Sequence, residues 1–217
     1  MTAPVVLVLG FEPFGGDSVN PSAEVARRLD GETCGRHRLV GELLPVTFAG
    51  APEVLARHLD RHAPELVVAL GLAGGRAEIA LERVAVNLVD ARIADNAGLQ
   101  PIDAEVLQGG PGAYFSSLPL KSIRTRLQAL GLPAELSLSA GTFVCNQVFY
   151  WLAHLLATEH PQTRGGFIHL PWLPEQAGNT ASNAFLPLES MLLAVRSAID
   201  CALHDTAAPP TVGGTLY

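Results

Sequence analysis

Cys145 stands at a point in the sequence where a thiol is readily activated. A small-residue turn at 140–142 precedes it, and a strongly helical segment at 143–158 contains it. A thiol in the first turn of a helix lies at the positive end of the helix dipole, which favours the thiolate form. The N–H groups of that turn can also stabilise a developing oxyanion. Cys145 is therefore the candidate nucleophile, with a buried core cysteine as the alternative interpretation.

His169 is the candidate for the general base that such a thiol requires. It comes near the end of the apolar run 165–170, which is typical of a buried strand. In doubly wound sheets the ligand crevice lies beyond the carboxyl ends of the strands. Cys145 and His169 are one strand–helix unit apart, so we expect them to lie close together. The alternative is a core histidine with one satisfied ring nitrogen.

A third group should orient the imidazole ring. The carboxylates available for this role are Glu82, Asp90, Asp95 and Asp103. Glu82 interrupts the alternating pattern of 79–88, although an exposed strand residue paired with Arg83 would fit the same spacing. Arg92 lies in the polar loop that follows, where it could face an anionic intermediate or lie on the surface.

Three other features have weaker links to chemistry. His58 and His62 are spaced i, i+4 without a His-Glu-x-x-His motif, so we expect a solvated helix face and no zinc site. The glycine-rich segment 71–75 lacks the G-x-G-x-x-G spacing and leads into strand-like residues, which argues against a nucleotide cofactor. Phe11 and Phe14 could wall an apolar pocket or simply pack over the sheet.

Strand and helix patterns alternate along the chain, and Asn20 is the expected N-cap of the first helix. Strands are expected at 4–10, 38–44, 65–70, 79–88, 135–139 and 165–170, and helices at 21–29, 50–62, 119–130, 143–158 and 188–203. This order predicts an α/β fold: a single domain with a mostly parallel (mixed) twisted sheet and helices on both faces. We expect the domain to span 1–206 and residues 207–217 to form a flexible C-terminal tail. The polar loop at 89–111 is long enough to indicate a functional role.

Composition excludes several classes of partner. The 217-residue chain has a formal net charge of -7 and no basic run, which argues against nucleic acid and anionic membranes. The three cysteines, Cys34, Cys145 and Cys201, have no paired spacing, so we expect neither disulfides nor a structural zinc site. Cys34 and Cys201 lie in a polar loop and in the last helix, and we interpret them as bystanders. No apolar stretch reaches the roughly 18 residues of a membrane helix and no signal peptide is evident, so a cytoplasmic location is expected.

Several ordered blocks of sequence resemble the type I pyroglutamyl peptidases, also called pyrrolidone-carboxylate peptidases. The blocks are GFEPFGG at 10–16 with NPS at 20–22, LERVAVNL at 81–88, ARIADN at 91–96, AGTFVCN at 140–146 and GGFIHLP at 165–171. One block alone would be weak, but their combination in this order is highly specific. The resemblance runs over nearly the whole chain.

The resemblance implies a cysteine exopeptidase, a thiol protease that removes an N-terminal pyroglutamyl (5-oxoprolyl) residue from peptides through an acyl-thioester. It implies Cys145 as nucleophile, His169 as base, Glu82 as orienting acid and Arg92 as support for the oxyanion. The implied substrate-binding residues are Phe11, Phe14, Leu72, Ile93, Phe143 and Val144. Family members are soluble, need no metal or other cofactor and often form homotetramers, so we expect a homo-oligomer.

Leu72 is the departure from the family pattern that bears most on substrate binding, because glutamine is common there beside the expected lactam contacts. Further departures are Glu12 for aspartate, Val46 for a pocket threonine and Leu81 for a proline. None of them removes a member of the implied triad. Other functions remain open: a relative that binds pyroglutamyl peptides without turnover, a nucleoside phosphorylase that would not need Cys145, or a nucleotide-dependent oxidoreductase that would need a cofactor.

Overall fold

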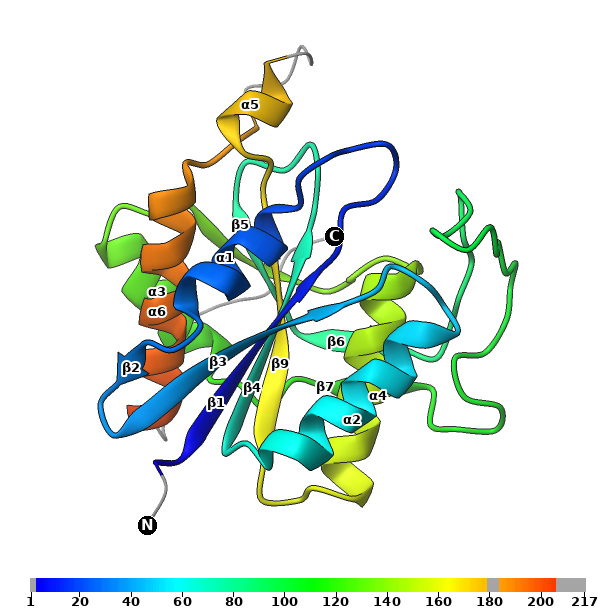
Figure 1. The fold of residues 1–217 in the computed structure, drawn as a ribbon, viewed down its shortest axis with the longest axis horizontal. Helices are drawn as coiled ribbons and strands as arrows, with labels where there is room; N and C mark the ends of the chain where they lie inside the picture. Colours follow the sequence, from blue (N-terminus) through cyan, green and yellow to red (C-terminus); the bar gives the residue numbers. More distant parts are fainter. Residues whose placement is uncertain (1–2, 179–183, 206–217) are drawn as a thin grey trace.

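One twisted sheet passes through the centre of the molecule, with the strand order β2-β3-β1-β4-β9-β5-β8 (Figure 1). The computed structural model describes residues 3–178 and 184–205, so the tail predicted at 207–217 lies outside the described residues. The strands are β1 Val5–Phe11, β2 Thr33–Cys34, β3 His37–Leu44, β4 Leu66–Leu72, β5 Ile79–Glu82, β8 Ala134–Ser137 and β9 Arg164–Leu170. β3, β1, β4 and β9 are parallel, whereas β5 and β8 run the opposite way and β2 is antiparallel to β3. The prediction of a mostly parallel, mixed sheet is confirmed.

Helices cover both faces of this sheet, as predicted. They are α1 Pro21–Leu29, α2 Gly50–His62, α3 Leu120–Ala129, α4 Val144–Thr158, α5 Pro174–Ala177 and α6 Leu188–His204. One core lies between the sheet and α1, α3 and α6, and the other lies between the sheet and α2 and α4 (Figure 1). β1 supplies Val6 and Val8 to the first core and Leu7 and Leu9 to the second. Burial on both faces explains why the parallel strands read as continuous apolar runs.

The segment expected as one strand at 79–88 forms two strands in two different sheets. β5 ends at Glu82, and β6, Val84–Val86, pairs with β7, Ala113–Phe115, in a separate two-stranded sheet. Between them, Arg83 still donates its N–H to the residue that ends β8, while its carbonyl accepts from the residue that follows β7. The prediction of one strand is wrong, because the backbone changes hydrogen-bond partners at Arg83, where charged residues interrupt the alternating pattern.

The long loop between β6 and β7 contains a buried carboxylate that organises one of its turns. Oδ2 of Asp95 accepts the N–H of Phe48 at 2.7 Å, and Oδ1 accepts the N–H groups of Ala97 and Leu99 at 2.8 Å. Asp95 is a buried polar residue, so these N–H groups replace the water that it gives up. The loop is thereby tied to the start of α2.

Two asparagines hold the same loop at other points. Nδ2 of Asn87 donates to the carbonyls of Leu107 and Gly110, and its Oδ1 accepts the N–H of Leu107. Nδ2 of Asn96 donates to the carbonyl of Pro13 at 2.9 Å, which joins this loop to the loop after β1. The loop is therefore held in place by side chains that bond to backbone groups, although it lacks regular secondary structure.

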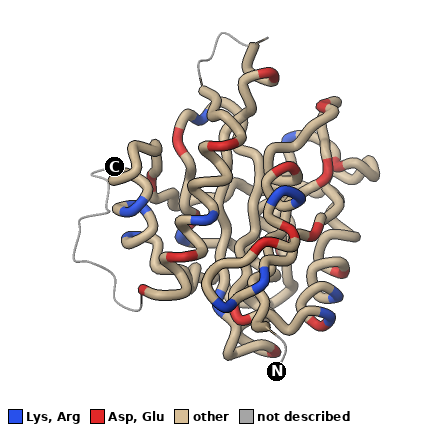
Figure 2. The backbone as a smooth tube through the Cα atoms, turned by 60° about the vertical axis from the view of Figure 1, so that its left-hand side comes forward, with Lys and Arg blue, Asp and Glu red and all other residues tan. Residues whose placement is uncertain are grey.

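Acidic and basic residues are distributed over the fold and do not form separate patches in the view of Figure 2. Within the described part of the chain, no helix is long and apolar enough to cross a membrane.

Asp95→Ala should destabilise the fold, because it leaves three backbone N–H groups without their acceptor. A loss of roughly 2–3 kcal/mol in the free energy of unfolding is expected for bonds to a charged group. Urea unfolding followed by circular dichroism measures it. Asp60→Ala is the matched control, since Asp60 lies on α2 with its side chain 75% exposed. Equal stability of the two variants would contradict the role given to Asp95.

Candidate active site

Cys145 is the second residue of α4, whose N-terminus follows a turn that needs glycine. Gly141 has a φ of +79°, in the left-handed region that suits a residue without a side chain. Phe143 is the N-cap in extended conformation and gives no side-chain cap. The first N–H groups of a helix have no partner within it. The half-buried thiol therefore lies beside N–H groups available to an anion.

Asn146 fixes the first turn of α4 against the segment that follows β5. Its Nδ2 donates to the carbonyls of Val86 and Leu88, both at 2.9 Å, and its Oδ1 accepts the N–H of Val86 at 3.0 Å. The residue has no solvent exposure. Sequence reasoning did not give Asn146 a role, although a polar residue next to the candidate nucleophile, at the start of a largely apolar helix, could have indicated one.

His169 and Glu82 lie on neighbouring antiparallel strands and form a buried pair. In the register of β5 and β9, Ala80 pairs with His169 and Glu82 pairs with Phe167. Nδ1 of His169 and Oε1 of Glu82 are 2.8 Å apart. Glu82 has 0% exposure, so the alternative of an exposed strand residue paired with Arg83 is wrong. The other ring nitrogen of His169, Nε2, is therefore available to a second hydrogen-bond partner.

That partner is the thiol of Cys145, and together the two neighbours determine the charge of the ring. Burial by itself lowers the pKa of His169. Hydrogen bonds to Cys145 and Glu82, and the charges of these two groups, raise the pKa to about 9. The imidazolium form is thus favoured at neutral pH, between a carboxylate on one side and a thiol on the other.

Arg76 provides a second positive charge beside the buried carboxylate. Its guanidinium lies 3.8 Å from Oε1 of Glu82 and 3.5 Å from Oε1 of Glu135, and it donates to Oγ of Ser137 at 3.4 Å. The other carboxylate oxygen of Glu82 is buried and has no hydrogen-bond partner among the described residues. Sequence reasoning missed Arg76, because only the fold brings it next to Glu82.

Gly71 allows the ring of His169 to lie flat against the neighbouring strand. The two residues pair in the register of β4 and β9. A Cβ at Gly71 would lie 2.9 Å from Cδ2 of His169 and 2.9 Å from the ring of Phe167. Phe167 in turn packs on His169, with ring centroids 4.9 Å apart. Close packing, rather than nucleotide binding, explains this glycine.

An apolar pocket opens beside the thiol. Its lining residues are Phe11, Phe14, Asn20, Val46, Leu72, Phe143, Val144 and Cys145. The hollow between these side chains is small and apolar. Of the implied substrate-binding residues, Ile93 does not line it and is 43% exposed.

Aromatic contacts support the walls of this pocket. The rings of Phe14 and Phe143 lie 6.2 Å apart, and Phe48 meets Phe143 edge-on at 5.2 Å. Phe48 is the residue whose N–H is held by Asp95, so the long loop supports the pocket wall from behind. Sequence reasoning missed Phe48, because its link to the pocket is through Phe143 alone.

The remaining candidates have different environments. Asp95 serves the backbone, and Asp90 and Asp103 are exposed, so Glu82 is the carboxylate that contacts His169. The side chain of Arg92 is exposed, with no hydrogen bond or ion pair to a described residue. Its loop nevertheless begins beside the nucleophile, because Oγ1 of Thr142 donates to the carbonyl of Asp90 at 2.8 Å.

Comparison with known proteins gives the site its family context. A model of the family described as pyroglutamyl peptidase matches residues 5–205. The chain belongs to the pyroglutamyl peptidase family. It is similar to the pyrrolidone-carboxylate peptidases of Cupriavidus taiwanensis, at 49% identity over 99% of this chain and 100% of that one, and of Bacillus cereus, at 44% identity over 98% and 99%.

Solved structures of pyroglutamyl peptidases have the same fold. The crystal structure of pyroglutamyl peptidase I from Bacillus amyloliquefaciens matches with a TM-score of 0.94 at 41% identity, covering 97% of this chain and 100% of that one. The pyrrolidone carboxyl peptidase of Thermococcus litoralis matches with a TM-score of 0.89 at 40% identity, over 92% and 93%. Members of this family therefore share the framework that brings Cys145, His169 and Glu82 together here.

The environments of the three cysteines predict which one reacts. Burial, and secondarily the charge of Asp200, raises the pKa of Cys34. Burial and a hydrogen bond to Asp205 raise the pKa of Cys201 to about 12. Iodoacetamide at neutral pH should therefore modify Cys145 first, and peptide mass spectrometry after timed alkylation would identify the site. Faster labelling of Cys34 or Cys201 would contradict the assignment.

Gly71→Ala should slow this alkylation, because the added methyl displaces the ring that pairs with the thiol. A loss of about tenfold or more is expected from a displacement on the order of 1 Å. Gly112→Ala is the control, since a Cβ there meets nothing within 4 Å. If Gly71→Ala reacted as fast as Gly112→Ala, the ring of His169 would not depend on Gly71.

Proposed function

We propose that this chain is a cysteine exopeptidase that removes the N-terminal pyroglutamyl residue from peptides through a Cys145–His169–Glu82 triad. Membership of the pyroglutamyl peptidase family supports removal of N-terminal pyroglutamate. The observation that carries the finer proposal is the chain of contacts from buried Glu82 through His169 to Cys145. These contacts end at Cys145, which also lines a small pocket with phenylalanine walls.

In the proposed reaction the thiolate of Cys145 attacks the carbonyl that joins pyroglutamate to the next residue. The tetrahedral oxyanion is stabilised by N–H groups in the first turn of α4. His169 gives its proton to the leaving amine, the C–N bond breaks, and an acyl-thioester remains on Cys145. The neutral ring then takes a proton from water, which attacks the thioester and releases pyroglutamate and the thiolate. Glu82 holds the ring in one tautomer and stabilises its charged form.

The pocket suits a neutral ring better than an ordinary peptide N-terminus. No carboxylate is among the described residues that line it, so an ammonium group would be buried beside them without a partner, at a high cost in free energy. Pyroglutamate has no ammonium group, because its nitrogen belongs to the lactam. Phe14 and Phe143, whose ring centroids lie 6.2 Å apart, give the pocket an apolar wall against which a flat five-membered ring can pack.

The polar atoms of the lactam require partners from the backbone. Apart from Cys145, Asn20 is the pocket-lining residue with a polar side chain, and its amide already bonds to Ser22 and to the carbonyl of Glu12. Leu72 has no polar side-chain atom, so any contribution from this position comes through its peptide groups. A prolyl residue lacks the lactam carbonyl and would leave such groups unpaired, which predicts discrimination against it.

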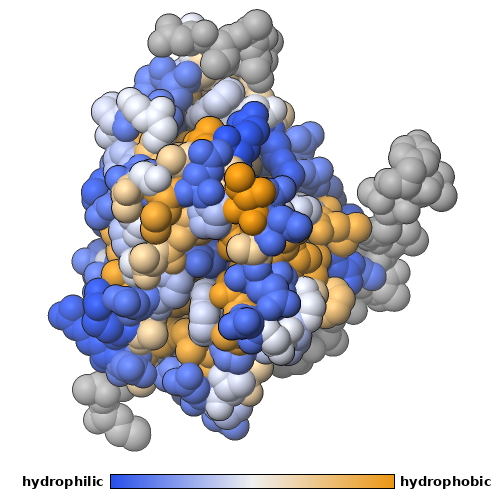
Figure 3. Space-filling model, turned by 90° about the vertical axis from the view of Figure 1, so that its right-hand side faces the viewer, coloured by the Kyte–Doolittle hydropathy of each residue, from blue (hydrophilic) through white to orange (hydrophobic). Residues whose placement is uncertain are grey.

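Arg92 and the state of assembly belong to the same proposal. Arg92 would support the anionic intermediate once a peptide fills the site, because its loop starts beside Thr142. We also propose a homotetramer in the cytoplasm, where free cysteines are expected to persist. Apolar side chains reach the surface on the face shown in Figure 3, and Ile102 of the long loop is 74% exposed, which supports an interface.

Hydrolysis of a pyroglutamyl fluorogenic amide, beside the prolyl amide, tests the activity. Release from the pyroglutamyl compound alone is expected, with loss of activity after alkylation by iodoacetamide. Cys145→Ala and His169→Ala should lower kcat/KM by at least about 10³-fold, and Glu82→Gln should lower it by at least about 10²-fold. Cys34→Ala is the control and should keep wild-type activity. If folded wild-type protein released no product, the proposed turnover would be wrong, and a binding role would take its place.

The pH profile of kcat/KM should fall at alkaline pH as His169 loses its proton. The pKa of His169 is raised to about 9, so the imidazolium is present below that pH and lost above it. Glu82→Gln removes a carboxylate that raises the pKa, and should therefore move the alkaline limb to lower pH. Stopped-flow or initial-rate measurements from pH 6 to pH 10, roughly the span around this value, give the alkaline limb in both proteins. An alkaline limb unmoved in Glu82→Gln would show that another group controls it.

A further inference from the structure

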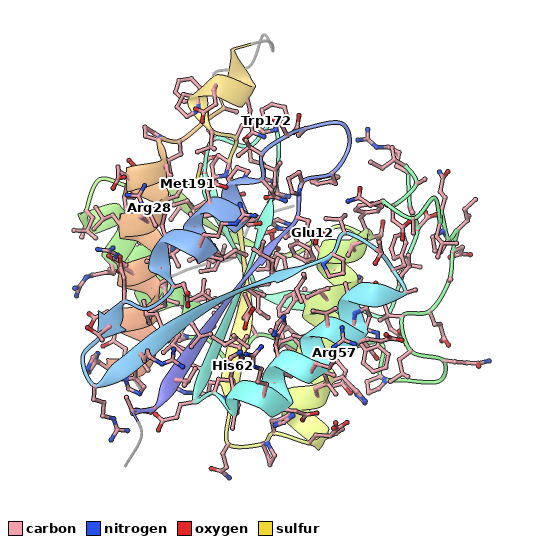
Figure 4. The ribbon with its side chains drawn as sticks, viewed as in Figure 1. Glu12, Arg28, Arg57, His62, Trp172 and Met191 are labelled. Carbon is pink, nitrogen blue, oxygen red and sulfur yellow. The ribbon has the colours of Figure 1, made fainter. Side chains whose placement is uncertain are left out.

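Outside the active site, three metal-ligating side chains converge between β3 and α2. Glu42 belongs to β3, and His58 and His62 lie one turn apart on α2. Figure 4 shows His62 at the end of α2, beside the ribbon of β3. None of the three lines the pocket next to Cys145. Among the described residues, this is the set of three histidine, cysteine or acidic residues whose ligand atoms all lie within 4.8 Å of one another.

The distances within this group suit one small cation. Nε2 of His62 lies 2.9 Å from Oε1 of Glu42, and Nδ1 of His58 lies 3.8 Å from the same oxygen. One ligand atom from each residue lies within 4.8 Å of the other two. Tetrahedral zinc with bonds of about 2.0–2.1 Å places its ligand atoms roughly 3.3 Å apart. The two distances to Oε1 of Glu42 therefore differ from this spacing by about half an ångström or less, and the two histidine nitrogens lie within 4.8 Å of each other.

The side chains are held in place rather than free in solvent. Those of His58, His62 and Glu42 are 14%, 11% and 26% exposed. The expectation that the two histidines lie on a solvated helix face is therefore wrong. Their rings stack with centroids 6.1 Å apart, which restricts the orientation of each ring.

Glu42 provides the negative charge of this group, and both histidines approach the same carboxylate oxygen, Oε1. Arg61 is the cation near the group, 3.9 Å from Oε1 of Glu42, and its side chain is 73% exposed and can turn into solvent.

We propose that Glu42, His58 and His62 bind one divalent transition-metal ion of the zinc class, with water in the fourth position. Two imidazoles and one carboxylate form a ligand set that zinc accepts. The ion would link β3 to α2, and α2 packs against α4, the helix that carries Cys145. Its role would be to stabilise the fold. The proposal is independent of the activity proposed above.

Calorimetric titration with ZnCl2 tests the site in the full-length Cys145→Ala variant, in which the active-site thiol cannot compete for zinc. One equivalent should bind. His62→Ala and His58→Ala should each weaken binding at least about tenfold. His204→Ala is the control, because that histidine is 65% exposed near Asp200 and lies outside the group. No binding, or binding unaffected by His58→Ala and His62→Ala, would overturn the proposal.

Thermal unfolding gives a second readout that does not depend on calorimetry. Zinc should raise the Tm of the Cys145→Ala protein, because an ion that binds the folded state alone stabilises it. Glu42→Gln keeps the shape of the side chain and should abolish this rise, even if the alanine variants fold poorly. CoCl2 should give a visible spectrum of nitrogen and oxygen ligands without thiolate charge transfer. A rise in Tm that persists in Glu42→Gln, or a thiolate band, would place the ion elsewhere.

Discussion

A carboxylate without solvent contact has to be stabilised by the protein, and Glu82 is such a group. Removing an ion from water costs several kcal/mol even after relaxation of the surroundings. His169 at 2.8 Å and Arg76 at 3.8 Å are the cationic neighbours that offset this cost. The pair depends on the direction of β5, because an antiparallel neighbour places Glu82 diagonally across from His169 on the same face of the sheet. The reversal of strand direction between β9 and β5 is thus part of the construction of the site.

The nucleophile reaches this pair through a second set of constraints. α4 packs on the face of the sheet that carries His169, and the amide of Asn146 holds its first turn to the backbone after β5. The same stretch of chain therefore provides Glu82 and anchors Cys145. Asp95 and Phe48 extend the support to the pocket wall. A polar loop without regular structure is needed here, because its backbone groups and side chains bond to several elements at once.

Local signals in the sequence were enough for much of the framework. The α2 helix has the predicted bounds 50–62. Asn20 caps α1 as predicted, with its side chain accepting the N–H of Ser22. Continuous apolar runs located the central strands. These features depend on neighbouring residues alone, which is why composition and spacing were sufficient to predict them.

Other features depend on residues far apart in the sequence, and no local pattern contains them. The end of β5 at Glu82 depends on partners in β7 and β8. The need for a glycine at Gly71 arises from the ring of His169 on the next strand. Arg76 and Phe48 acquire a place at the site only when the sheet is assembled. The direction of β5 likewise follows from the sheet order. The alternating pattern at 79–88 therefore could not predict why Glu82 is buried.

The arrangement separates charge from recognition. Glu82, His169 and Arg76 lie together on one side of the thiol, where each ion has an oppositely charged neighbour. The pocket on the other side is walled by phenylalanine, leucine and valine side chains, and among its described lining residues Cys145 is the one that can ionise. A free ammonium group entering it would meet neither water nor a carboxylate, whereas a lactam ring would lose little by leaving water if backbone groups bond to it. On the proposed function, selection therefore works largely by exclusion. The replacement of a polar residue by Leu72 is compatible with it, because a pocket of this kind discriminates through the absence of charge as much as through the contacts it offers.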